Sequence, residues 1–385
     1  MRRCYTRVRR TPSQEHAVNL SEFLLVWRTT SLPDREVIDG LVHPLHAGPS
    51  AALAAALAHW PGSYYWSTEP DGRHLVLTRA FAHRRVRWGL HVLLLVATLF
   101  TTTFVGAVFN GALPLDPNPL ALLLGTYALP THFLRAWATG LTFSLPLVAV
   151  LLCHELGHYL TARHYQLDVS PPYFIPFPFL PWSIGTIGAF IRLRTIVSDR
   201  RQLLDVGIAG PLAGLAIALP ALWIGLRLSN PLPGFDQTGM LLGIGLDKLP
   251  LGDSLVTLAL RRLVHGGAPA ILLHPLAVAG WFGLFVTMLN LLPVFQLDGG
   301  HILYATLPRR HQRIALAFWI LIVLLGWFWR GWLLWGLLVL LLSRGHLGHP
   351  PVLDMHRPLP ESRRLLAWVA LGLFVCTFVP VPFRM

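Results

Sequence analysis

Long apolar runs alternate with short basic segments along most of the chain. After residue 87 the apolar runs cover about 88–110, 139–162, 204–228, 269–293, 314–329, 331–343 and 365–382. A run of about 20 apolar residues can cross a bilayer as a helix, so the first four runs are long enough to span. The two shorter runs on either side of Arg330 are expected to form a tight hairpin. The pattern predicts a polytopic α-helical membrane protein with about six or seven transmembrane helices.

Residues 1–82 follow a different pattern. The alanine-rich segment "SAALAAALAHW" predicts a helix, and "SYYWSTEPDGRHLVLTRA" holds two β-rich runs around the turn sequence Pro70-Asp71-Gly72. We therefore expect a small cytosolic α+β domain at residues 1–82 and a transmembrane domain at residues 83–385. The first domain carries no chemical motif, and no catalytic role is predicted for it.

Composition supports the membrane interpretation. Of 385 residues, 54% are hydrophobic and only 13% are charged, and the net charge is +13, whereas a soluble domain has about a quarter charged residues. The arginines lie beside apolar runs rather than in stripes interleaved with aromatic residues. Positive-inside topology explains them, so the lipid bilayer is an expected partner and nucleic acid is not. The three cysteines lie far apart and predict neither a disulfide framework nor a cysteine zinc site.

Arginine placement also predicts the orientation of the spans. Arg84, Arg85 and Arg87 precede the first apolar run, which places the N-terminus inside. The connection 111–138 has almost no positive charge and is expected outside. The second run therefore travels inward, and its end near Arg163 lies at the cytosolic face.

The second apolar run contains the stretch "LLCHELGHYL", residues 151–160. Residues four apart lie on one face of a helix, so His154 and His158 can hold one metal ion through their imidazoles. Zinc suits two nitrogen ligands and a carboxylate, with one position left for water. Glu155 is placed to accept a proton from that water, which is the chemistry of peptide-bond hydrolysis. The alternative is that both histidines only form hydrogen bonds between helices.

A third ligand is available in "NLLPVFQLDGGHI", residues 290–302. Asp298 follows the fourth run, at the predicted depth of His158, and Gly299 and Gly300 free the backbone to bring its carboxylate close. The alternative is that Asp298 is the N-cap of the next helix. The HExxH motif at the same depth favours the ligand interpretation.

These two motifs together resemble the site-2 protease family of intramembrane zinc metalloproteases. The family pattern combines HExxH with a distant N-x-x-P-x-x-x-L-D-G, which Asn290, Pro293, Leu297, Asp298 and Gly299 match position by position. The resemblance covers about residues 88–310 and points to the bacterial or plastid-type branch without a PDZ domain. It identifies residues 83–385 as a transmembrane metalloprotease domain.

The resemblance implies roles for individual residues. His154, His158 and Asp298 are the expected ligands of one Zn²⁺ per chain, and Glu155 is the expected catalytic acid and base. Asn290 matches a catalytic asparagine that helps to position or stabilise the scissile carbonyl. The alternative for Asn290 is a hydrogen bond between helices.

The same resemblance implies an activity and a location. We expect a multi-pass integral protein of the bacterial inner membrane with its active site towards the cytosol. Its expected reaction is hydrolysis of peptide bonds in or near the transmembrane segments of membrane-protein substrates. The alternative function is that of a metal transporter or metal-sensing membrane protein with the same ligands.

A possible substrate-binding strand lies between the two motifs. "GAFIRLRT", residues 188–195, alternates apolar and basic residues as a strand does, and its edge is suited to an unwound peptide by β-addition. Gly188, Phe190 and Arg192 are the candidate substrate-binding residues, and the alternative is a re-entrant or surface hairpin. In "GIAGPLAG", residues 207–214, the glycine spacing favours close helix packing. His301 is expected either to support the zinc ligands or to face the cytosol.

Overall fold

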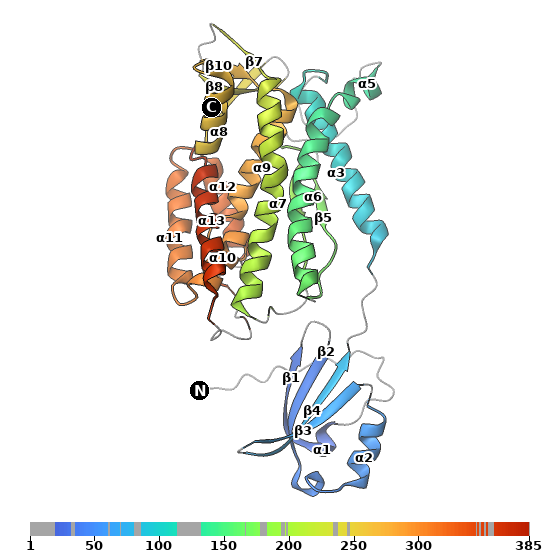
Figure 1. Ribbon diagram of the computed structural model, residues 1–385. Helices are drawn as coiled ribbons and strands as arrows, with labels where there is room; N and C mark the ends of the chain where they lie inside the picture. The colour runs from blue at the N-terminus through green and yellow to red at the C-terminus, as the bar shows by residue number, and fades with distance from the viewer. Residues whose placement is uncertain are drawn as a thin grey trace. The chain divides into compact units, whose positions relative to one another are not determined.

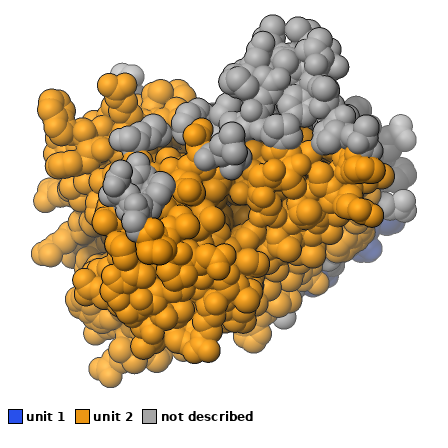
Figure 2. Space-filling view, turned by 90° about the horizontal axis from the view of Figure 1, so that it is seen from above, with its two compact units in different colours: residues 1–84 blue, residues 85–385 orange. Residues whose placement is uncertain are grey.

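The computed structural model of the chain describes residues 20–384, except for 32–34, 61, 70, 81–85, 114–131, 166, 178–182, 194–196, 198, 234–237, 245–246, 344, 346–347, 350–351 and 353–357. The chain divides into two compact units, residues 1–84 and residues 85–385, which Figure 2 distinguishes by colour. The first unit is an α+β unit, and the second is mainly helical (Figure 1).

The first unit is built on an antiparallel sheet of four strands in the order β1-β2-β4-β3. Its elements are α1 (Leu20–Phe23), β1 (Leu24–Ser31), β2 (Arg35–Val42), α2 (Ala51–Ala58), β3 (Gly62–Glu69) and β4 (Gly72–Ala80). Alternating residues of the strands meet the apolar face of α2, where Leu53 and Leu57 pack against Leu75 and Leu77. The β3–β4 hairpin turns at Asp71 and Gly72, as the turn sequence predicts; Pro70 lies outside the described residues.

One buried histidine ties the sheet to the hairpin turn. Nδ1 of His74 lies 3.0 Å from Oδ1 of Asp39, and Nε2 lies 3.1 Å from Oδ1 of Asp71. The hydrogen bond with Asp39, together with the charges of both carboxylates, raises the pKa of His74 above its ordinary value despite burial. Glu69 also lies near His74 and Asp39. Because both ring nitrogens already face carboxylates, we interpret the group as an ion-paired imidazolium.

This arrangement predicts that the first unit loses stability as the pH rises. A histidine with a raised folded pKa contributes stability fully below its unfolded pKa of about 6.5, and the contribution is lost as pH rises through the folded pKa. Hydrogen exchange on the full chain should show protection factors of the β4 amides falling across that window. The His74→Gln variant should show lower protection at acidic pH and no such fall. A fall of equal size in the variant would contradict the assignment.

The second unit contains ten described helices. They are α3 (Trp88–Phe109), α5 (Phe133–Ala138), α6 (Leu141–His164), α7 (Arg200–Arg227), α8 (Leu255–His265), α9 (Pro275–Asn290), α10 (Asp298–Thr306), α11 (His311–Leu325), α12 (Gly331–Leu342) and α13 (Glu361–Thr377). Three of those described, α3, α6 and α7, are long and apolar enough to cross a membrane, and α9, α11 and α12 are shorter apolar helices. The unit is therefore that of an α-helical membrane protein.

The fourth apolar run does not form one long helix. Residues 270–272 form strand β10, and α9 has only 16 residues. Pro275 starts this helix at a position where no amide donor is needed, and the His274 side chain accepts a hydrogen bond from the Leu276 amide. The expectation that residues 269–293 supply a fourth full-length span is wrong for this reason.

Two small sheets complete the second unit. One has the order β7-β10-β8-β9, from β7 (Asn230–Pro231), β8 (Gly239–Ile244), β9 (Asp247–Leu251) and β10 (Ala270–Leu272). The other pairs β5 (Tyr173–Pro176) with β6 (Thr186–Phe190) in antiparallel fashion. The prolines around β5 thus do not prevent a strand at Tyr173–Pro176. Strand β6 overlaps the start of the alternating segment 188–195.

Close helix packing at small residues holds the bundle together. α6, α7 and α9 lie side by side (Figure 1), and α7 packs against both of the others. A Cβ added at Gly157 of α6 would press against the carbonyl of Ala209, and one at Gly280 of α9 would press against the backbone of Leu222. Backbones that approach this closely fix the relative heights of the three helices, which positions the residues discussed next.

Candidate active site

Helix α6 presents two histidines on one buried face. His154 and His158 are only 4% and 6% exposed, and their Nε2 atoms lie 3.1 Å apart. At a rise of about 1.5 Å per residue, His158 lies roughly 9 Å before the helix end at His164. The pair is therefore inside the helical bundle, nearer to the end of α6 that carries Arg163.

Asp298 brings a carboxylate to the same point from another part of the chain. Its Oδ2 lies 3.2 Å from Nε2 of His154 and 3.3 Å from Nε2 of His158. Asp298 is the first residue of α10, and Leu297 is its N-cap, so the side chain does not act as the helix cap. The alternative that the sequence left open for Asp298 is thus not what the structure shows.

The two glycines after Asp298 make this approach possible. A Cβ at Gly299 would overlap the carbonyl of Leu291, and one at Gly300 would overlap the carbonyl of Phe295. The chain from the end of α9 therefore folds tightly against the start of α10. Only a residue without a side chain fits at these two positions.

The three ligand atoms form a nearly equilateral triangle with edges of 3.1–3.3 Å. Zinc bonds to nitrogen and oxygen are about 2.0–2.1 Å, so two corners of a tetrahedral zinc site lie about 3.3 Å apart. Oδ2 of Asp298 is buried and makes no hydrogen bond to any residue that the structure describes. Donor type, spacing and this orphaned oxygen all fit a zinc ion with one open position.

Helix α7 fixes the orientation of one ligand. Nδ1 of His158 lies 2.7 Å from the carbonyl oxygen of Val206, to which it donates, so Nε2 keeps its lone pair for the triangle. One turn further along α7, a Cβ at Gly210 would overlap the His158 imidazole ring, and Gly214 lies against His154. The glycine spacing indicated only close packing. Without knowing which helix faces α7, the sequence could not show that these glycines pack against the side chains of metal ligands.

Glu155 lies beside the triangle and is also buried. The backbone N–H of Ile191, the residue after β6, lies close enough to its carboxylate to interact with it. This contact connects the two-stranded sheet to the predicted catalytic residue. Ile191 lies within the segment 188–195 that the sequence predicted as a strand, but no residue type there pointed to a contact with Glu155.

Asn290, the last residue of α9, also reaches this group. Its Nδ2 lies 3.1 Å from Nε2 of His154. The side chain is therefore at the ligand triangle, as its predicted role requires, and it also joins α9 to α6. Both interpretations of Asn290 remain compatible with this contact.

The three candidate substrate-binding residues lie on or just after β6, away from the ligand atoms. Gly188 has a φ of 118° with open space where a side chain would be, and the Phe190 ring stacks on Tyr173 at 5.4 Å. The Arg192 side chain is exposed, while its backbone forms two hydrogen bonds with Ser170. Their link to the site is through the neighbouring Ile191 and Glu155.

His301 makes contacts that the sequence did not predict. Its Nδ1 lies 2.6 Å from Nε2 of His349, and the rings of Tyr304 and His311 adjoin that histidine. His301 thus belongs to a histidine and tyrosine cluster that begins three residues after the ligand Asp298 on α10. No sequence feature pointed to His349, because a loop residue 48 positions away offers no spacing signal.

A helix-borne HExxH pair joined by an aspartate from a later LDG segment defines a zinc metallopeptidase centre within an apolar bundle. Comparison with known proteins agrees: residues 142–326 match the family model "Peptidase family M50". The chain is 38% identical over 167 residues to "Probable zinc metalloprotease EGY1, chloroplastic" of Oryza sativa subsp. japonica, covering 43% of this chain and 28% of that protein. No solved structure matches the chain.

Two further relatives match over more of the chain. "Probable zinc metalloprotease EGY2, chloroplastic" of Oryza sativa subsp. indica is 31% identical over 254 residues, covering 63% of this chain and 44% of the relative. "Probable zinc metalloprotease EGY1, chloroplastic" of Arabidopsis thaliana is 32% identical over 244 residues, covering 63% and 43%. The chain therefore spans less than half the length of these curated relatives. The match to the M50 model covers just under half of the chain, and the relatives fit the plastid-type branch of the site-2 protease family that the two motifs resemble.

The contact between α7 and His158 predicts an effect on metal affinity. Gly210→Ala is expected to displace the His158 ring and lower zinc affinity by about 10- to 100-fold, the usual range for losing a group that supports a ligand. Metal content of the purified full chain, measured after competition with a chelator, checks this. Gly372→Ala is the matched control, since a Cβ at that helical position meets nothing within 4 Å. Equal zinc retention in both variants would contradict the assigned contact.

Proposed function

We propose that the protein is a zinc-dependent intramembrane endopeptidase that cleaves membrane-protein substrates in or near their transmembrane segments. The observation that carries the proposal is the triangle formed by Asp298 with His154 and His158, which lie beside Glu155 on the buried face of an apolar helix of 24 residues. Ionisable groups at such positions are costly and are associated with function. The names of the relatives, which describe zinc metalloproteases, support the same reaction.

In this proposal His154, His158 and Asp298 hold one Zn²⁺, which when bound polarises the scissile carbonyl and acidifies a water molecule. Glu155 takes the proton of the attacking water and returns it to the leaving amine. The Ile191 N–H lies close to the carboxylate of Glu155. Asn290, with its amide beside His154, is placed to support the carbonyl oxygen of the substrate.

We further propose that β6 receives the unwound substrate. One edge of this strand pairs with β5, while Ile187 is 61% exposed and Phe190 is also exposed. A peptide added along the other edge would gain backbone hydrogen bonds that replace those lost when its helix unwinds. The direct contact of Ile191 with Glu155 would then place the peptide near the catalytic carboxylate.

Arginines support a position for the active site towards the positive-inside face. Arg163 ends α6, Arg200 and Arg201 start α7, and Arg309 and Arg310 follow α10. His158 would lie roughly 9 Å from that face, and six or seven membrane passes would accommodate the apolar helices. The relatives are named as chloroplastic, so they do not support the expected bacterial inner membrane; we propose a membrane of the plastid type.

A metal transporter with the same ligands is the second candidate. Transport requires ligands that can release the ion along a path, whereas Glu155 is buried beside the triangle, close to the backbone N–H of Ile191. That arrangement favours catalysis.

The Glu155→Gln variant separates the two candidates. Cleavage of a transmembrane substrate is expected to fall by at least about 100-fold, because the group that moves the proton is lost. Zinc content should stay near one per chain, since Glu155 is not a ligand. Purified full chain in detergent or vesicles allows both measurements.

The Asp298→Ala variant is expected to give a different result, in which both bound zinc and substrate cleavage are lost. Unchanged cleavage in Glu155→Gln would overturn the protease proposal. Zinc flux into vesicles that depends on His154 and His158 would favour the transporter.

A further inference from the structure

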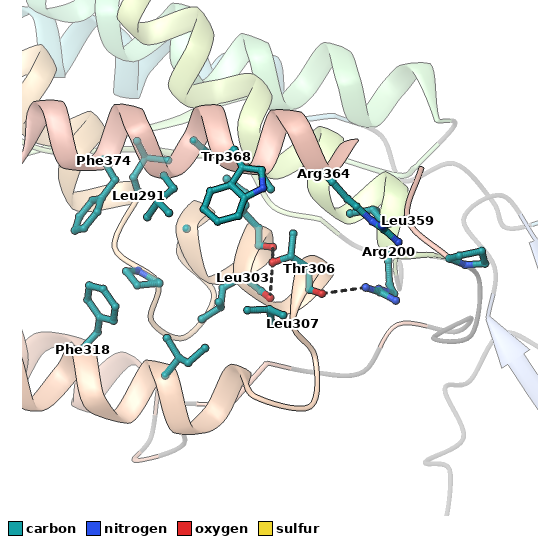
Figure 3. A pocket seen from close by; sticks show the side chains of 18 residues that line it. Arg200, Leu291, Leu303, Thr306, Leu307, Phe318, Leu359, Arg364, Trp368 and Phe374 are labelled. Atoms are coloured by element: carbon teal, nitrogen blue, oxygen red, sulfur yellow. Dashed lines mark hydrogen bonds between the residues drawn. The ribbon is translucent and has the colours of Figure 1, made fainter. Parts of the chain in front are cut away.

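A cavity of about 670 Å³ lies apart from the catalytic triangle, between α10, α11 and α13 (Figure 3). Its walls are almost entirely apolar, with Ile302, Leu303, Phe318, Leu371 and Phe374 among the lining residues. The volume falls within the range of small-molecule sites in proteins, about 300–1,000 Å³. Since Trp368 is 70% exposed and Leu371 46% exposed, the cavity opens on a surface that would face lipid.

Two arginines stand at one end of this apolar cavity, and none of its lining residues is acidic. Figure 3 shows Arg200 and Arg364 together beyond Thr306. Arg200 donates from Nε to the carbonyl of Ala305 at 2.7 Å and from Nη2 to that of Thr306 at 3.1 Å. Because a guanidinium has five N–H donors, three remain for another acceptor.

Arg364 is available to an anion for a different reason. The adjacent Arg363, and not Arg364, is paired with Asp205, at 3.0 Å between Nη2 and Oδ2. Glu361 precedes Arg364 by three residues, yet no ion pair joins them in the part of the chain that the structure describes. Trp368 lies one turn after Arg364 and also lines the cavity, and tryptophan favours the boundary between apolar and polar layers.

More positive charge surrounds the opening. Leu307 and Ile314 line the cavity, and Arg309, Arg310 and Arg313 lie between them with exposed side chains. Basic pockets between membrane helices on the cytosolic or matrix side attract the head groups of anionic lipids. The cavity thus combines an apolar body with a cationic end.

We propose that this cavity binds one anionic phospholipid, with an acyl chain among α10, α11 and α13 and the phosphate at Arg200 and Arg364. A helical substrate segment fits less well, since a helix is about 10 Å across and ten residues of it fill more than about 1,000 Å³. A single acyl chain is narrower and flexible. The proposal does not depend on proteolysis, although the cavity also touches Leu291 and Pro293 in the segment that leads to Asp298.

Native mass spectrometry of the full chain in detergent tests the proposal with three probes. These are a phosphatidylglycerol, a phosphatidylcholine with the same acyl chains, and glycerol phosphate without chains. Phosphatidylglycerol is expected to bind at one per chain and more tightly than phosphatidylcholine. Glycerol phosphate should not compete with it.

Two pairs of variants test the two halves of the site. Arg364→Gln should weaken phosphatidylglycerol binding about fivefold, the effect expected of one arginine near a lipid phosphate. Its control, Arg330→Gln, removes an exposed arginine at the other end of α11 and should leave binding unchanged. Ala367→Phe fills the cavity and should abolish phosphatidylglycerol binding. Its control, Val369→Phe, changes a residue on the same helix but outside the cavity and should leave binding unchanged.

Several results would overturn the proposal. These are equal binding of both lipids, full competition by glycerol phosphate, wild-type binding in Ala367→Phe, or displacement of the lipid by a transmembrane peptide. The Glu155→Gln variant should bind phosphatidylglycerol as the wild type does. Failure of lipid binding and failure of the protease proposal are therefore separate results.

Discussion

Three lone pairs that converge on one point inside an apolar bundle impose the main constraint on this structure. His154 and His158 are buried, and Oδ2 of Asp298 is buried with no hydrogen-bond partner among the described residues. Burying such groups without a partner costs several kcal/mol each on typical scales, on the order of 2–7. An arrangement with a metal ion at the centre removes that cost, and the surrounding helices serve to hold the triangle at the required size.

Helix α7 does most to hold the ligand triangle in place, although it supplies no ligand. Its Val206 carbonyl holds Nδ1 of His158, and Gly210 lets the imidazole lie directly against the α7 backbone. The same face meets α10, where Gly207 lies against His301 and the carbonyl of Asp298. A change in the height of α7 by one residue would therefore disturb ligands on two other helices at once. The small residues along this face of α7 thus allow close helix packing and at the same time position the metal ligands.

The extent to which sequence predicts the site differs from residue to residue. HExxH needs only the helical period, so the two histidine ligands follow from local spacing. Asp298 lies far along the chain and was predicted from its expected depth and the LDG motif. Ile191 and Val206 act through backbone atoms, which leave no mark in residue type. The contact of His301 with His349 joins positions 48 apart through a loop, and no periodicity encodes it.

The fold shows the same division between local and tertiary determinants. The β3–β4 hairpin and α2 follow from a turn sequence and an alanine-rich run capped by Ser50. The apolar run 269–293 was misleading because hydropathy cannot distinguish a buried strand from a helix. β10 is apolar because it pairs between β7 and β8, and only those tertiary partners decide its conformation.

Arginines at one end of the second unit fall into two groups with different physical roles. Asp205 is the partner of Arg363 and lies 3.9 Å from Arg201, and it also accepts a hydrogen bond from the hydroxyl of Tyr165. That carboxylate thereby joins α6, α7 and α13 through one hydrogen bond and two ion pairs. Arg200 instead caps the carbonyl end of α10, the helix that begins with Asp298. Because α10 has only nine residues, a contact at its last turn is about 12 Å from the ligand carboxylate. Arg200 at the cationic end of the cavity and the ligand Asp298 therefore lie at opposite ends of the same short helix.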